Sequence, residues 1–280
     1  MKKVALLLLC LAFAVSATER INYGSGSAGE SSLIKGSYVL LESYSVEVAA
    51  GFGMAIKDDV ANSIWISDWS DCFNYEFDMT NGNPTGDGWD ITDGIDADDM
   101  GYCEYGSGNQ FFFGDYTFSN IGVFSDAGAY VKSIDGPGGW ANVFGMGAGH
   151  DMLYCARSSE IAWGSYTGTE TEVTWTVEAV PAGIYGLAVY GDNLFLCNSV
   201  DTPGEDNIFI YDINADGSVN LTPVWSCEFT ENSNSTNGGI DWDGTYLWIY
   251  PQQDMLYKLD IDWVPGSLEN TTWGQIKADF

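Results

Sequence analysis

The chain has 280 residues, with 40 acidic side chains against 9 Lys and Arg, which gives a formal net charge of −31. That charge excludes nucleic acid and anionic lipid as partners, because binding phosphate requires clustered basic side chains. The aromatic content of 15% and the 34 glycines exclude a disordered acidic tail, since such tails contain few aromatic residues. After the N-terminus no apolar run approaches the roughly 18 residues of a membrane span, so we expect no membrane insertion.

The N-terminus has the pattern of a signal peptide. MKK precedes the apolar run VALLLLCLAFAV, and Ala17 is the small residue that the peptidase prefers at a cleavage site. We therefore expect residues 1–17 to be removed and the protein to be exported, either to the periplasm or to the extracellular space. Residues 18–36, which include GSGSAGESS, are predicted to be a flexible N-terminal segment.

The cysteines do not define the fold. Five of them follow the signal peptide at wide spacing, and this pattern predicts neither a disulfide framework nor a C-x-x-C metal site. A chain of this length buries enough apolar surface to fold without such links. We expect Cys155 and Cys197 to be buried, free and unreactive.

A repeated unit is the strongest pattern in the sequence. Each copy has a strand that opens on glycine, a short turn rich in Asp, Asn or Gly, and a second strand with a run of large apolar residues, as in GLAVYGDNLFLCN. A third and a fourth strand follow in most copies, and no sustained helical pattern follows the signal peptide. Successive opening glycines are 48, 44, 41 and 53 residues apart. These glycines are Gly53, Gly101, Gly145, Gly186 and Gly239.

Four short strands repeated about every 46 residues indicate a β-propeller. The sequence therefore predicts an all-β domain over residues 37–280, with five four-stranded blades and almost no helix. The last blade needs an outer strand to close the ring. SYSVEV, from Ser43, and the C-terminal stretch TTWGQIKAD are two candidates for that strand, and a sixth, degenerate blade from residues 30–50 is a further alternative.

The last repeats resemble those of secreted bacterial propellers. GIDWDGTYLWIYPQQDMLYKLDI, from Gly239, is similar to repeats of the YVTN, NHL and quinoprotein-like type, and a weaker similarity covers essentially all of the mature chain. The resemblance implies a propeller fold. It implies no particular activity, because such propellers include lectins, hydrolases, cyclotransferases, lyases and scaffolds.

Candidate binding residues come from one face of the predicted propeller. Ligands of propellers usually lie at the axis, on the face built by loops that leave second strands and enter first strands. Here those loops carry carboxylates, amides and aromatic rings, which suit the hydroxyls and ring faces of a carbohydrate. Solvated loop residues of a very acidic protein are the alternative interpretation. The candidate ligand-binding residues are Asp68, Trp69, Asp115, Tyr116, Trp140, Arg157, Asn198 and Gln252.

Two acidic segments are candidates for calcium, the one cofactor that the sequence suggests. The segment DGIDADD supplies Asp93, Asp96 and Asp98. The segment DINADGSVN matches the first nine positions of an EF-hand or dockerin loop and supplies Asp212, Asn214 and Asp216. Pro223 stands where such a loop needs a bidentate acid, so a tight turn between two strands is the alternative there.

Motifs for catalysis are weak. The one histidine, His150, cannot form a multi-histidine metal site, and it falls in a predicted turn on the opposite face. No G-x-S-x-G or phosphate-binding loop occurs. The first blade begins with Gly51-Phe52-Gly53 and lacks the signature, containing His and Asp-Pro, of five-bladed glycosidases.

We therefore predict a monomeric, non-catalytic binding propeller that recognises a glycan or a cell-surface protein. The alternatives are a structural scaffold of the cell surface and an enzyme, either a glycan-active hydrolase or lyase or a cyclotransferase. Aromatic residues clustered at one mouth of the channel would favour binding, and scattered aromatic residues would favour a scaffold. Converging carboxylates with a raised pKa would favour an enzyme.

Overall fold

The computed structural model describes residues 34–48, 50–57, 60–91, 94–105, 108–198, 204–231, 237–252 and 254–263. These residues form the strands β1 to β19. No helix in these ranges is long and apolar enough to span a lipid bilayer. The predicted signal peptide, residues 1–17, and the predicted flexible segment up to residue 33 lie outside the described residues.

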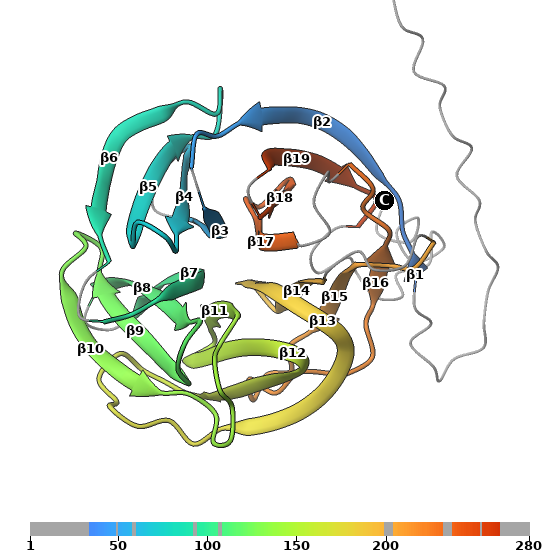
Figure 1. The fold of residues 1–280 in the computed structure, drawn as a ribbon. Helices are drawn as coiled ribbons and strands as arrows, with labels where there is room; N and C mark the ends of the chain where they lie inside the picture. The colour runs from blue at the N-terminus through green and yellow to red at the C-terminus, as the bar shows by residue number, and fades with distance from the viewer. Residues whose placement is uncertain are drawn as a thin grey trace, which may run out of the picture. The chain divides into compact units, whose positions relative to one another are not determined.

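The strands form the five-bladed β-propeller that the repeat predicts, with the blades arranged around a common axis (Figure 1). Blades 1, 2 and 5 are separate four-stranded sheets. Blade 1 consists of β3 (Gly51–Ile56), β4 (Ser63–Asp68), β5 (Phe73–Asp78) and β6 (Pro84–Asp90). Blade 2 consists of β7 (Ala97–Tyr105), β8 (Gly108–Asp115), β9 (Asn120–Ser125) and β10 (Tyr130–Asp135). Blade 5 consists of β17 (Asn237–Trp242), β18 (Leu247–Pro251), β19 (Met255–Ile261) and β2 (Tyr38–Ser45).

Blades 3 and 4 are joined in one sheet, because β13 (Thr176–Tyr190) is both the last strand of blade 3 and the innermost strand of blade 4. Blade 3 also contains β11 (Gly145–Gly149) and β12 (Met152–Ser165). The N–H of Tyr166 donates to the carbonyl of Asp151 at 2.7 Å, so the two ends of β12 meet and the strand folds back on itself. Ser158, with φ of 49°, lies in the bend. Blade 4 continues with β14 (Asn193–Asn198), β15 (Ile208–Asp212), β16 (Trp225–Cys227) and β1 (Ile34–Lys35).

The ring is closed by the N-terminal strand. β2 pairs antiparallel with β19, with Ser43 opposite Tyr257. The closing strand therefore includes the start of the predicted segment SYSVEV, but it covers Tyr38–Ser45 and ends before Val46. The competing C-terminal stretch TTWGQIKAD lies outside the described residues. Because β2 belongs to blade 5, the residues proposed for a sixth blade are used in closing five.

The core lies between neighbouring blades, where both faces of each inner strand are covered. β4, β14 and β18 are buried along their whole length. The innermost strands β3, β7, β11, β13 and β17 contact one another in that cyclic order and surround the axis. The five described cysteines are free, and Cys155 and Cys197 are buried, as predicted.

Candidate functional site

A β-bulge recurs near the start of the innermost strand. In four blades the pairing between the first and second strands shifts register at this level, and a bulge re-aims side chains out of the regular ladder. Three blades carry an aromatic residue here, one carries glycine and one carries an acid. The five residues are Phe52, Asp98, Phe144, Tyr185 and Gly238.

The next residue along is glycine in four blades and Asp99 in blade 2. Met100 pairs with Phe113 just as Met54 pairs with Ile66, and this register places Asp99 where blade 1 has Gly53. Gly101 was predicted to open blade 2, and that alignment is wrong by two residues, because blade 2 has Asp99 at the glycine position and its next glycine is Gly101. Matching the repeats by their opening glycines therefore missed that blade 2 has an acid at this position.

Asp99 closes the axis of the propeller. Its buried carboxylate accepts hydrogen bonds from the N–H groups of Met54 (3.3 Å), Met146 (3.1 Å) and Leu187 (3.0 Å), which belong to blades 1, 3 and 4. A Cβ on Gly53 would lie 2.3 Å from the Asp99 Cα, so glycine is needed beside it. Burial raises the pKa of Asp99, while these amide donors act in the opposite direction. We call Asp99 and its three donors the axial plug.

Asp98 lies beside the axial plug, but the hydrogen bonding of its side chain differs from that of Asp99. It is 1% exposed, and its Oδ2 atom has no hydrogen-bond partner. Its main-chain carbonyl accepts from the Ser67 hydroxyl at 2.6 Å, which fixes the backbone but gives the Oδ2 atom no partner. Burial raises the pKa of Asp98 well above its ordinary value, and the carboxyls of Asp99, Asp96 and Asp115 raise it further.

Two predicted acids shape the turns that carry exposed aromatic residues. Asp68 and Asp115 end β4 and β8, and each begins the pattern Asp-aromatic-Ser/Thr. The Oδ1 atom of Asp68 accepts from the N–H groups two and three residues ahead at 2.8 and 3.1 Å, and Asp115 does the same at 2.8 and 2.9 Å. Such side-chain bonds to the backbone fix a tight turn, and here they hold Trp69 and Tyr116 at the surface.

The pKa values of these two acids shift in opposite directions. For Asp68, burial acts to raise the pKa, but hydrogen bonds from Asp71, Ser70 and Ala50 outweigh it and the pKa is lowered. For Asp115, burial raises the pKa and the amides of the following turn only partly offset it.

Aromatic rings cluster at this mouth of the channel. Trp69 and Tyr116 are 39% and 51% exposed, and they stack with ring centroids 6.4 Å apart. From Tyr116 the contacts continue to Phe144 at 5.9 Å, to Tyr185 at 5.1 Å and to Phe52 at 6.0 Å. Blades 1 and 4 are not neighbours in the ring, so Phe52 and Tyr185 meet across blade 5, which contributes only glycine at this level. We call these five aromatic residues together with Asp98 the aromatic mouth.

The other predicted binding residues lie elsewhere or at the edge of this site. Arg157 is half-buried in the bend of β12, Asn198 ends β14 and Gln252 follows β18, so they mark the same end of the ring in blades 3, 4 and 5. Trp140 is 8% exposed and packs in the core with Phe112 and Val143. The structure therefore brings Asp68, Trp69, Asp115 and Tyr116 together and places Trp140 in a stabilising role.

Four of the six predicted calcium ligands take part in local hydrogen bonds, whereas the Oδ2 atom of Asp98 has no partner. Asp96 accepts from the Thr117 hydroxyl at 2.6 Å, and Asp93 lies outside the described residues. In the second segment Asp212 accepts from Asn193, while Asn214 and Asp216 both bond to Ser218. This segment forms the tight turn between β15 and β16. In the described part of the chain no group of three or more acidic, Cys or His side chains is arranged to hold a metal, and calcium stays a prediction.

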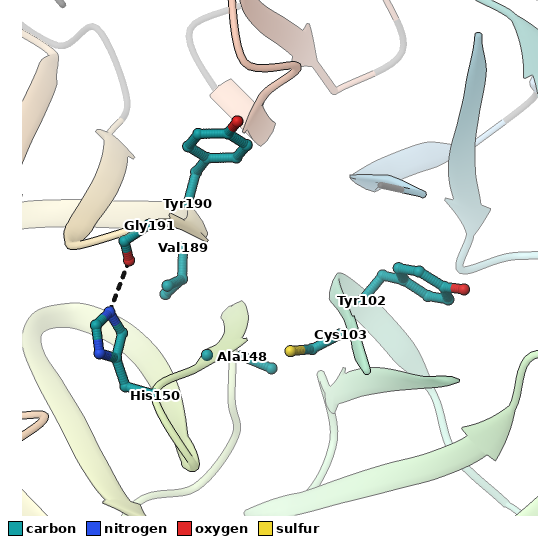
Figure 2. Close-up of a pocket in the computed structure, with 8 residues that line it drawn as sticks. Tyr102, Cys103, Ala148, His150, Val189, Tyr190 and Gly191 are labelled. Atoms are coloured by element: carbon teal, nitrogen blue, oxygen red, sulfur yellow. Dashed lines mark hydrogen bonds between the residues drawn. The ribbon is translucent and has the colours of Figure 1, made fainter. Parts of the chain in front are cut away.

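Two cavities lie at the opposite mouth, where the innermost strands end. The smaller has a volume of about 250 Å³ and is lined by the ends of β7, β11 and β13 (Figure 2). His150 lines it and bonds through Nε2 to the Gly191 carbonyl at 2.7 Å, which joins two neighbouring turns. The larger cavity, of about 550 Å³, lies between the turns of blades 1 and 5 and shares Tyr190 with the smaller. Sequence analysis did not place a site at this mouth.

Comparisons with known proteins identify the fold. No family model matches the chain, and no curated protein matches it in sequence. Among solved structures, the glutaminyl cyclase of Myxococcus xanthus is similar with a TM-score of 0.61 and 11% identity, covering 82% of this chain and 99% of that one. The PQQ-bound aldose sugar dehydrogenase of Streptomyces coelicolor gives 0.48 and 10% identity over 81% and 99%. The virginiamycin B lyase of Staphylococcus aureus gives 0.44 and 14% over 75% and 66%. The likeness to the glutaminyl cyclase, at 11% identity, shows the propeller fold alone, and the function has to come from the site itself.

Proposed function

We propose that this protein is a carbohydrate-binding propeller whose ligand lies on the aromatic mouth. The observation that carries the proposal is the exposed, stacked pair of Trp69 and Tyr116. Most large aromatic side chains of a soluble protein are at least partly buried, so two neighbouring exposed rings held by matching acidic turns are unusual. Flat apolar rings of this kind pack against the C–H face of a sugar.

Polar groups for the sugar hydroxyls lie beside the rings. Asp71, in the turn after β4, is exposed, and Asp96, before β7, is half-buried. Ionised carboxylates accept hydrogen bonds from hydroxyls, and such charge-assisted bonds are the stronger kind. A surface that combines stacking rings with carboxylate acceptors supports recognition of a neutral or cationic glycan and disfavours an anionic one, because of the net charge of −31.

A glycan array with the full chain tests this proposal. The wild-type protein should bind at least one glycan, and Trp69→Ala or Tyr116→Ala should weaken that binding about tenfold through loss of stacking. Tyr130→Ala is the matched control, since Tyr130 is 38% exposed on the outer strand β10, away from the mouth. A folded, monodisperse wild-type protein that binds no glycan would contradict the proposal, as would equal binding by the Trp69 and Tyr130 variants.

Catalysis is a second candidate, favoured by the raised pKa values of Asp98 and Asp115 at the mouth. A carboxyl that keeps its proton near neutral pH can act as a general acid on a glycosidic oxygen. The test is to incubate the full chain with a glycan that it binds and to search for products by mass spectrometry. Products formed by wild type and absent with Asp98→Asn would support this function, and an unchanged glycan would argue against it.

We also propose that the protein acts outside the cytoplasm. The basis is the N-terminal sequence MKKVALLLLCLAFAV, which has the charged and apolar regions of an export signal. N-terminal sequencing of the protein recovered from its source cells would test this, and a start at Thr18 is the expected result. A chain that still begins at Met1 would contradict it.

A further inference from the structure

Five acids in and around the aromatic mouth and the axial plug have no cationic partner among the described residues. Asp68, Asp96, Asp98, Asp99 and Asp115 all lie at the ends of β4, β7 and β8. The ion pairs in the described part of the chain are Lys35–Asp206, Lys57–Asp126 and His150–Asp192, and none of them involves this group. Four of the five acids are buried, where like charges repel most strongly because the dielectric is low.

Asp98 is the member of this group whose state demands an explanation. A buried polar group without a hydrogen bond costs about 1–3 kcal/mol, and buried side-chain polar atoms in native proteins are nearly always paired. Asp68 and Asp99 satisfy that rule with main-chain amides, whereas the Oδ2 atoms of Asp98 and Asp115 have no partner. A ligand that supplies hydrogen-bond donors and positive charge would remove this cost.

The surroundings of Asp98 point to an organic cation. The N–H of Asp99 donates to the Phe144 carbonyl at 3.0 Å, so β7 lies against the backbone of Phe144. On its other side, a Cβ on Gly53 would lie 2.7 Å from the Asp98 carbonyl, so β7 also lies against the strand that carries Phe52. Tyr185 contacts both of these rings. Aromatic faces attract an ammonium group electrostatically, and the attraction grows when the site is shielded from water.

We propose that the sugar bound at the aromatic mouth is an amino sugar with a free, protonated amine, and that this ammonium group pairs with the carboxyl of Asp98. The inference rests on the proposed function of glycan recognition and names the class of glycan. The sugar ring lies on Trp69 and Tyr116, and its amine points toward the axis. The net charge of −31 assists this ligand, since the field of the whole protein attracts cations toward the mouth.

Other cations fit the mouth less well. A divalent metal needs several oxygen ligands around one point, and three acids in such an arrangement do not occur in the described residues. A basic peptide would use the acids but leave the flat, exposed faces of Trp69 and Tyr116 without a role. An amino sugar uses both the rings and the carboxyl.

Binding of the amine changes the protonation of Asp98. Three carboxyls raise the pKa of Asp98: Asp99 on the same strand, Asp96 before it and Asp115 at the end of β8. The other titratable groups on neighbouring strands are the carboxyl of Asp68, at the end of β4, and the phenol of Tyr185 in β13. All the carboxyls among them favour the neutral form of Asp98. An arriving ammonium group favours the ionised form, so the proton of Asp98 is released to solvent as the ligand binds.

Calorimetric titration of the full chain with three tetrasaccharides tests the proposal. The probes are β-1,4-linked tetramers of glucosamine, N-acetylglucosamine and glucose, measured at about 0.15 M salt to screen distant charges. We expect the glucosamine tetramer to bind at least about tenfold more tightly than the other two, as for a hydrogen-bonded charge. The binding enthalpy should also depend on the ionisation enthalpy of the buffer, because the buffer takes up the protons that Asp98 releases.

Two variants separate a local effect from net charge. Asp98→Asn should remove both the preference for the glucosamine tetramer over the glucose tetramer and the buffer dependence of the binding enthalpy. Asp87→Asn removes the same charge from the exposed strand β6 and should leave the preference intact. Thermal unfolding of each variant reports whether it is folded, and the comparison of the three sugars on wild type does not depend on any variant.

The outcomes distinguish the two proposals. Equal affinity for the three tetramers would overturn the amino-sugar inference and leave glycan recognition standing. Lack of binding to these tetramers and to every glycan on the array would overturn both. Tetralysine or calcium competing with the glucosamine tetramer at equal or lower concentration would overturn the amino-sugar inference in favour of a peptide or a metal. If the Asp98 and Asp87 variants lose the preference for the glucosamine tetramer equally, that preference comes from nonspecific attraction by the net charge. This result would also overturn the amino-sugar inference.

Discussion

Asp99 and Asp98 are consecutive residues of β7, yet they belong to regions with different tasks. In the axial plug, Asp99 accepts main-chain hydrogen bonds from three other blades, so its carboxylate ties the ring together. In the aromatic mouth, Asp98 is equally buried but its Oδ2 atom has no partner. A fully paired buried acid is explained by the fold, whereas an unpaired one requires a reason outside it. This contrast is our basis for separating structure from function here.

The largest effect should come from breaking the plug. Asp99→Ala leaves three buried amides without an acceptor, and at about 1–3 kcal/mol each the free energy of unfolding should fall by about 3–9 kcal/mol. Urea denaturation at neutral pH measures this loss. A loss below about 1 kcal/mol would mean that the plug does not hold the blades together.

Two tryptophans sharpen the same comparison. Trp140→Ala should lower the free energy of unfolding by about 3–5 kcal/mol, because it opens a cavity in the core between blades. Trp69→Ala should change it by no more than about 0.5 kcal/mol, as for an exposed side chain away from the core. The same denaturation experiment compares them, and similar losses would show that Trp69 is a structural residue.

The turn acids give an intermediate and pH-dependent effect. Asp68→Ala removes the bonds to Ser70, Asp71 and Ala50 and should cost about 1–2 kcal/mol at neutral pH, like the loss of a helix cap. The pKa of Asp68 is lowered in the folded state, so its contribution is present above the unfolded-state pKa. The difference between wild type and variant should therefore shrink as the pH falls through the folded-state pKa. Denaturation at several pH values checks this, and a difference that grows in acid would have the wrong sign.

Asp98 should show the smallest effect on stability at neutral pH. Asp98→Asn keeps the shape and removes an ionisable group, so the free energy of unfolding should stay within about 1 kcal/mol of wild type or rise. Because the pKa of Asp98 is raised in the folded protein, the folded state binds the proton more tightly than the unfolded state does. Wild-type stability should therefore fall as the pH rises above the unfolded-state pKa, up to the folded-state pKa, and this decline should be weaker in the variant. Parallel pH profiles would argue that Asp98 is not buried as described.

Much of this architecture was accessible from sequence, since the repeat spacing and the succession of short strands predict five blades. The closing strand was left open between SYSVEV, which overlaps β2 at residues 43–45, and the C-terminal stretch TTWGQIKAD. The turns at Asp68-Trp69 and Asp115-Tyr116 were also found as candidates, because acids and aromatic residues directly follow apolar strands. Asp98 was predicted only as a calcium ligand, and the role of Asp99 was missed, because a β-bulge leaves no periodic signal in the sequence. Phe52, Phe144 and Tyr185 were missed as a cluster for the same reason, and Trp140 looked like a loop residue although its ring packs into the core.

The central claim is that the aromatic mouth binds ligand while the axial plug holds the fold. The most direct test measures two properties of Trp69→Ala side by side, the binding of an array-selected glycan and the free energy of unfolding. We expect binding to weaken about tenfold with stability unchanged within about 0.5 kcal/mol. Undiminished binding by the folded variant would contradict the account.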